Sequence, residues 1–110
     1  MKTKIDSVEN ALKHPTFDAT NDPTEETQLT IANWDLRDLP GWLVYIREAW
    51  NHNYGRMWEE NGMLKMATGG WSGNEFIIQA MRRNYIPWSM LWESSHRGGL
   101  EVFRMPNDRS

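Results

Sequence analysis

The stretch GGWSGNE, from Gly69 to Glu75, combines three glycines, an indole ring and the signature of a helix start. Ser72 and Glu75 have the S-x-x-E spacing of a capping box, in which each side chain accepts a backbone N–H of the first helical turn. The positive end of a helix attracts phosphate and carboxylate groups, and glycines let a ligand approach the backbone. One interpretation is therefore an anion or nucleotide pocket in which Trp71 stacks on a planar group.

The other interpretation of this stretch is a plain corner between a strand and a helix. Glu75 would then occupy the helix start, and the glycines would only turn the chain. The stretch matches neither the phosphate loop GxxxxGK[ST] nor the dinucleotide motif GxGxxG. The corner is therefore the favoured interpretation.

A second glycine-rich loop, SSHRGG, spans Ser94 to Gly99. The planar guanidinium of Arg97 suits oxyanions, and His96 could reinforce such a site. If the strand before Gly69 and the strand after the following helix run in the same direction, both loops gather at one edge. A simple hairpin loop is the favoured alternative. The candidate ligand- or partner-binding residues are Gly69, Gly70, Trp71, Ser72, Asn74, His96 and Arg97.

Catalytic and metal-binding patterns are not found. The three histidines are scattered and have no carboxylate or second histidine at metal-ligand spacing: His14, His52 and His96. The serines lack a nucleophile elbow, and the chain has no cysteine. We therefore expect a non-enzymatic protein without a metal or cofactor.

The composition indicates one domain that binds through aromatic side chains. Seven tryptophans and seven methionines occur in 110 residues, and both types are enriched at protein interfaces. Twelve basic and fifteen acidic residues give a net charge of -3, which attracts neither nucleic acid nor anionic lipid in general. Single-stranded nucleic acid bound by Trp faces with Arg82 and Arg83 is a weaker alternative. Without a signal peptide, a long apolar run or cysteines, a cytoplasmic protein is expected.

Local signals predict an α+β fold with the order helix, hairpin, helix, hairpin. Asp38 caps a first helix that ends near Asn53, and Asn61-Gly62 joins strands 56–60 and 63–67 by a type I′ turn. A second helix runs from Ser72 to Asn84 and buries Phe76, Ile77, Ala80, Met81 and Tyr85. Alternation from Pro87 to Glu93 and the run 100–103 predict the last hairpin. The expected sheet is four-stranded and mostly antiparallel, with helices on one face. The second and third strands allow either a right-handed parallel crossover or insertion of the fourth strand between them, and the favoured order is first, second, fourth, third.

The chain divides into three expected parts. Residues 1–35 form a short helix capped by Ser7 and an acidic, partly mobile arm, because the run 18–30 is polar and poor in large apolar residues. Residues 36–105 form the single α+β domain. Residues 106–110 form a tail that frays.

The segments GGWSGNEFI and IPWSMLWESSHRGGLEVF, within residues 69–103, resemble a segment of small, mostly uncharacterised proteins encoded by phages and prophages. The resemblance covers about a third of the chain and carries over no catalytic residues. It implies a short accessory protein of the class that includes inhibitors of host enzymes and defences. The leading hypothesis is a protein that binds a macromolecular partner in the cytoplasm of a bacterial host, and the alternative is binding of a nucleotide or phosphometabolite.

Overall fold

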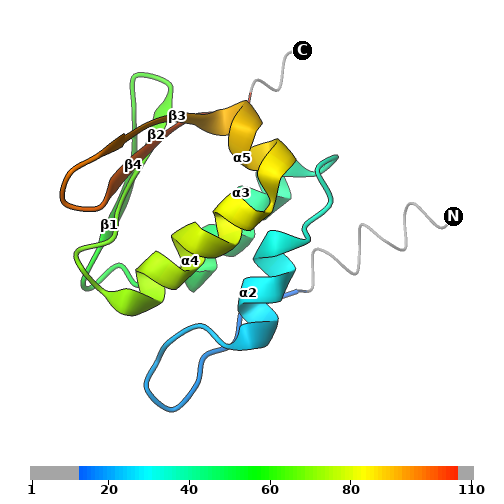
Figure 1. The fold of residues 1–110 in the computed structure, drawn as a ribbon, viewed down its shortest axis with the longest axis vertical. Helices are drawn as coiled ribbons and strands as arrows, with labels where there is room; N and C mark the ends of the chain where they lie inside the picture. Colours follow the sequence, from blue (N-terminus) through cyan, green and yellow to red (C-terminus); the bar gives the residue numbers. More distant parts are fainter. Residues whose placement is uncertain (1–12, 107–110) are drawn as a thin grey trace, which may run out of the picture.

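The computed structural model describes residues 13–106 and places a layer of helices against one sheet (Figure 1). The helices are α2 (Glu25–Ala32), α3 (Leu39–Ala49), α4 (Ser72–Arg83) and α5 (Tyr85–Leu91). The strands are β1 (Arg56–Glu60), β2 (Met63–Ala67), β3 (Trp92–His96) and β4 (Leu100–Arg104). The α+β class is thereby confirmed.

The sheet is antiparallel throughout and has the order β1-β2-β4-β3, as the sequence predicts. Leu64 lies opposite Phe103 in the register of β2 and β4, and both side chains are buried. Met66, two residues further along β2, is on the same face and is also buried. The labelled helices lie on one side of the sheet, so this face forms the core (Figure 1).

The β1–β2 hairpin and helix α3 follow from their local signals. Asn61 and Gly62 have φ angles of 56° and 77°, which a type I′ turn requires. The carboxylate of Asp38 accepts the N–H of Gly41 at 3.0 Å and caps α3. The helix ends at Ala49, earlier than the predicted end at Asn53, with Trp50 as its C-cap.

Residues 25–32 form a helix, so the acidic loop expected from the polar run 18–30 is wrong from residue 25 onward. The Thr24 side chain accepts the N–H of Thr27 and caps α2. Thr27 and Ile31 are buried, and α2 packs against α3 and α4. The helix predicted from Ser7 falls mostly on residues outside those described, as does the tail after Pro106.

The expected strand from Pro87 to Glu93 is also wrong, because residues 85–91 form α5. Pro87 is the third residue of this helix, where its missing N–H removes no helical hydrogen bond. Tyr85 was expected in the core but is exposed. Strand β3 begins only at Trp92, and it includes Ser94 to His96, which were expected in a loop. The helices α2 and α5 thus interrupt the predicted order of helix, hairpin, helix, hairpin.

Candidate functional site

The two glycine-rich loops meet at one end of the sheet. Ala67 at the end of β2 pairs with Leu100 at the start of β4. Just beyond this pair, the N–H of Thr68 donates to the carbonyl oxygen of Gly99 at 3.0 Å. The predicted site residues in the two loops are therefore brought to the same end of the molecule.

The capping box predicted from Ser72 and Glu75 does not form. Ser72 is the first residue of α4 rather than its N-cap, and the N-cap residue Trp71 makes no hydrogen bond through its side chain. Thr68 organises the turn instead. Its carbonyl oxygen accepts the N–H of Trp71 at 3.2 Å, and its hydroxyl oxygen accepts the N–H of Gly70 at 3.3 Å.

Gly69 is required by close packing of the chain. Its φ angle is +67°, and a Cβ atom built on it would lie 1.8 Å from the carbonyl oxygen of Tyr54. Gly70 has a similar φ angle of +75°, but no atom lies within 4 Å of the position of its Cβ. The first glycine thus permits contact between two loops, whereas the second only turns the backbone.

The side chain of Asn74 connects this corner to the end of α3. Its Oδ1 accepts the N–H of Asn51 at 2.8 Å, while its Nδ2 donates to the carbonyl oxygens of Asn51 at 3.1 Å and Thr68 at 3.3 Å. Asn74 is buried, and both ends of its amide are occupied by the backbone. Its amide therefore braces the fold.

Trp71 stacks on a ring of the protein itself. The rings of Tyr54 and Trp71 lie 4.6 Å apart between centroids and at 10° to each other. One face of the indole is covered by this contact. Tyr54 is the more exposed member of the pair and remains open to solvent.

His96 and Arg97 lie at the tip of the β3–β4 hairpin and are both exposed. His96 Nε2 and Ser94 Oγ form a hydrogen-bonded pair at 2.9 Å. Among residues 13–106, Arg97 forms no ion pair with a carboxylate. The turn therefore presents a cation to solvent near the corner loop.

A second region, which no sequence motif indicated, exposes large apolar side chains on α5 and at the start of β3. The exposed fractions are 73% for Tyr85, 52% for Ile86, 59% for Met90 and 42% for Trp92. Ile86 and Met90 are one turn apart on the same side of the helix, Tyr85 and the exposed Ser89 lie beside them, and Trp92 follows the end of the helix. We call the four large residues, Tyr85, Ile86, Met90 and Trp92, the α5 surface.

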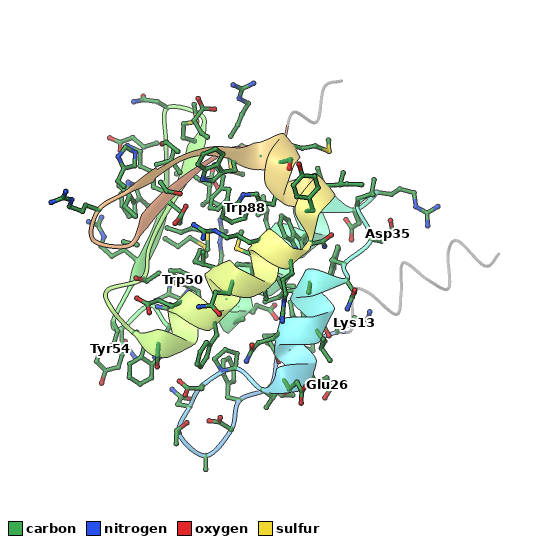
Figure 2. All side chains as sticks on the ribbon, in the orientation of Figure 1. Lys13, Glu26, Asp35, Trp50, Tyr54 and Trp88 are labelled. Carbon is green, nitrogen blue, oxygen red and sulfur yellow. The ribbon has the colours of Figure 1, made fainter. Side chains whose placement is uncertain are left out.

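The opposite side of α5 packs on the core. Pro87 and Leu91 are buried, and Trp88 meets Phe103 of β4 edge to face with ring centroids 5.2 Å apart. The indole of Trp88 also stacks on Trp92 at 6.4 Å. Figure 2 labels Trp88 in this region, well separated from Tyr54. Apart from Ser89, helix α5 is therefore apolar on both sides, although one side is exposed.

A chain of polar contacts orients Trp92. Its indole N–H donates to Ser95 Oγ at 2.9 Å, and the Ser95 hydroxyl donates to Glu101 Oε1. Arg82 of α4 approaches the other carboxylate oxygen of Glu101 at 3.5 Å. Because Glu101 is buried, these donors offset the cost of removing its charge from water.

The loop between α2 and α3 borders the start of α5. Asn84 Nδ2, at the junction of α4 and α5, donates to the carbonyl oxygens of Ile31 and Trp34, each at 3.1 Å. In the same loop, Asp35 pairs with Arg37 at 2.7 Å. Hydrogen bonding to the Arg37 side chain lowers the pKa of Asp35 from 3.8 to about 2.

Helix α4 separates the two regions. Residues 68–74, which we call the glycine corner, lie at its start, and the α5 surface follows its end. Its 12 residues give a length of about 18 Å at 1.5 Å per residue. The two regions are therefore distinct surfaces.

Among the described residues, no three His, Cys, Asp or Glu side chains are grouped so that they could hold a metal ion. None of the helices between residues 13 and 106 is long and apolar enough to cross a membrane.

Comparisons with protein-family models, with curated proteins and with solved structures found no match for this chain.

Proposed function

We propose that this chain is a non-enzymatic accessory protein that binds a protein partner through the α5 surface. The observation that carries the proposal is the exposure of Tyr85, Ile86 and Met90 on one side of a helix whose other side is already buried. A helix that is apolar all round is normally enclosed. Clustered exposed apolar side chains are typical of protein interaction sites.

The side chains of the α5 surface are also the types that contribute most to binding. Tyrosine, tryptophan and methionine are enriched at interface centres. Contacts with Ser95 and Trp88 hold Trp92 in place before a partner arrives. A side chain that is already ordered loses less conformational entropy on binding.

The biological role that we propose is that of a phage-type protein acting in the cytoplasm of a bacterial host, for example as an inhibitor of a host enzyme or defence system. The resemblance of residues 69–103 to phage and prophage proteins supports this role. The α5 surface lies within that segment. A binding role also agrees with the lack of a catalytic pattern in the sequence.

The small-ligand alternative stays a prediction, and no specific contact favours it. At the corner, Asn74 is occupied by backbone groups, and Tyr54 covers one face of Trp71. Binding of single-stranded nucleic acid is also less favoured. Tyr85 and Trp92 carry rings that can stack on bases, but Ile86 and Met90, the other half of the α5 surface, have neither a ring nor a charge.

Affinity capture from a bacterial lysate tests the proposed function. The baits are the wild-type protein, Ile86→Asp and the matched control Val44→Asp. Val44 is an exposed aliphatic residue on α3 with an exposed fraction of 56%, close to the 52% of Ile86. Circular dichroism and urea denaturation establish that each bait is folded.

We expect wild type and Val44→Asp to capture the same protein, and Ile86→Asp to capture at least about tenfold less, as for loss of a central interface residue. Equal capture by all three baits would overturn the proposal. So would the absence of any protein specific to the wild-type bait.

A further inference from the structure

We infer that the partner of the α5 surface presents an apolar patch bordered by carboxylates. This inference rests on the proposed function and specifies the chemistry of the partner. It is based on the distribution of charge around α5.

The charge beside α5 is opposite to that of the whole chain. The chain has a net charge of -3, yet α5 contains no charged residue and is separated by one residue, Asn84, from Arg82 and Arg83 at the end of α4. Arg83 is exposed and forms no ion pair with any carboxylate among residues 13–106. A cation that has no ion-pair partner among the described residues therefore lies two residues before the apolar surface in the chain.

Arg82 is only partly engaged. One of its terminal nitrogens lies 3.5 Å from Glu101, and its guanidinium carbon lies 5.2 Å from the ring centroid of Trp88. More than half of its side chain is exposed. Because a guanidinium has five N–H donors, Arg82 can bind a second carboxylate without losing the first.

The acidic side chains in the same neighbourhood have cationic partners of their own. Glu93 of β3 pairs with Arg104 at 3.2 Å. Asp35, in the loop held to α5 by Asn84, pairs with Arg37 at 2.7 Å. Neither carboxylate compensates Arg83, so charge complementarity selects an acidic border on the partner.

The same arrangement disfavours two other occupants. A second copy of this chain, docked face to face, would bring two borders rich in arginine together. A nucleic acid would satisfy the arginines but leave Ile86 and Met90 without an apolar counterpart. A protein with an apolar centre and carboxylates at its edge satisfies both features.

Selection from a display library of random peptides tests the inference without knowledge of the natural partner. The wild-type protein is the bait, and peptides that also bind Ile86→Asp are removed. We expect the recovered peptides to combine Leu, Ile or aromatic residues with adjacent Asp or Glu. Two further measurements test the other occupants, nucleic acid and a second copy of the chain. The wild-type protein is titrated with a single-stranded oligothymidylate, and the oligomeric state of the protein alone is measured by sedimentation.

One recovered peptide is then titrated against wild type, Arg83→Glu and the control Arg56→Glu. Arg56 is exposed on β1, outside the α5 surface, and its replacement changes the net charge equally. We expect Arg83→Glu to weaken binding by about fivefold, as for loss of a rim ion pair, and added salt to remove most of that difference. Arg56→Glu should bind like wild type.

Four results would overturn the inference: recovered peptides without acidic enrichment, equal losses in both charge variants, oligothymidylate binding that depends on Ile86, and a dimer that Ile86→Asp dissociates. Ile86-dependent capture from lysate together with peptides that are not acidic would leave the proposed function intact and reject only this inference. Capture that is independent of Ile86, with no peptide recovered, would reject both.

Discussion

The glycine corner and the α5 surface lie at opposite ends of α4 and differ in how their side chains are used. At the corner, Gly69, Trp71 and Asn74 each contact another part of the chain closely. On the α5 surface, Ile86 and Met90 are 52% and 59% exposed. Residue types that suit ligand binding also build tight turns, so a binding role depends on whether their groups are already occupied.

The largest expected effect concerns the corner, where Gly69→Ala and Gly70→Ala form a matched pair. Gly70→Ala should lower the free energy of unfolding by about 1–2 kcal/mol, because alanine is strained at positive φ. Gly69→Ala should cost this amount and about 1–3 kcal/mol more, because its Cβ displaces the backbone of Tyr54. Urea denaturation measures both variants. Equal destabilisation would show that the contact with Tyr54 is unimportant.

Asn74→Ala tests whether the corner is a brace. The substitution leaves the N–H of Asn51 without an acceptor, while the carbonyl oxygens of Asn51 and Thr68 each lose one of their two donors. We expect a loss of about 3 kcal/mol in the free energy of unfolding, since a buried unsatisfied group costs about 1–3 kcal/mol. The exposed position Gln79→Ala on the same helix is the control and should change stability little. A loss below about 1 kcal/mol would contradict the role of Asn74 as a brace.

The fold was predictable where a local signal has one structural solution. Asn61-Gly62 requires positive φ at both positions, and Asp38 with Pro40 marks the start of α3. The strand order was also expected. Helix α2 was missed because its buried residues, Thr27 and Ile31, lie within a polar, acidic segment.

Helix α5 was missed because its sequence is apolar apart from Ser89 and has no clear helical period. The alternation of Trp88, Met90 and Trp92 has the period of a strand, and Pro87 also suits the start of one. Exposure of this segment depends on which elements cover it in the tertiary structure. The absence of charged residues from Tyr85 to Leu91 indicates that this segment is not an ordinary amphipathic surface helix.

The corner between a strand and a helix was expected at Gly69 to Ser72, but the contacts that its side chains make within the chain were not predictable. The N–H that Asn74 binds belongs to Asn51, 23 residues earlier in the chain. The ring that covers Trp71 belongs to Tyr54, also in a different element. Such partners follow from the packing of α3 and its loop against the corner, which no short motif encodes.

Ser95→Ala examines the internal support of the α5 surface. It removes the hydroxyl that joins the indole N–H of Trp92 to the buried carboxylate of Glu101. We expect a loss of about 1–2 kcal/mol in the free energy of unfolding and a red shift of Trp92 fluorescence, because a buried acceptor loses a donor. The spectra of wild type and of Ser95→Ala are each compared with the spectrum of the same protein carrying Trp92→Phe. The difference isolates the fluorescence of Trp92. An unchanged stability and spectrum would exclude a supporting role for Ser95.

Met90→Ser probes the surface itself. Because Met90 is exposed and its substitution opens no cavity, we expect the free energy of unfolding to change by less than about 0.5 kcal/mol. Leu91→Ser, on the buried side of the same helix, should be far more destabilising. Similar losses for the two variants would indicate that Met90 is packed within the protein.

The smallest expected effect concerns Asp35, in the loop beside α5. Its pKa is lowered from 3.8 to about 2, so its charged form is favoured in the folded protein. The resulting stabilisation is present above pH 3.8 and is lost as the pH falls toward about 2. Asp35→Asn should therefore show a slightly smaller loss of stability over this interval than wild type. Superimposable profiles of stability against pH for wild type and Asp35→Asn would contradict the lowered pKa of Asp35.

Site-specific photocrosslinking in bacterial lysate distinguishes the α5 surface from the glycine corner most directly. A photoreactive side chain is placed at residue 86 in one protein and at residue 72, which is also exposed, in another. We expect a discrete crosslinked protein from position 86 that is removed by excess unlabelled wild type but not by excess Ile86→Asp. A discrete product only from position 72 would contradict binding through α5 and would assign the interaction to the corner.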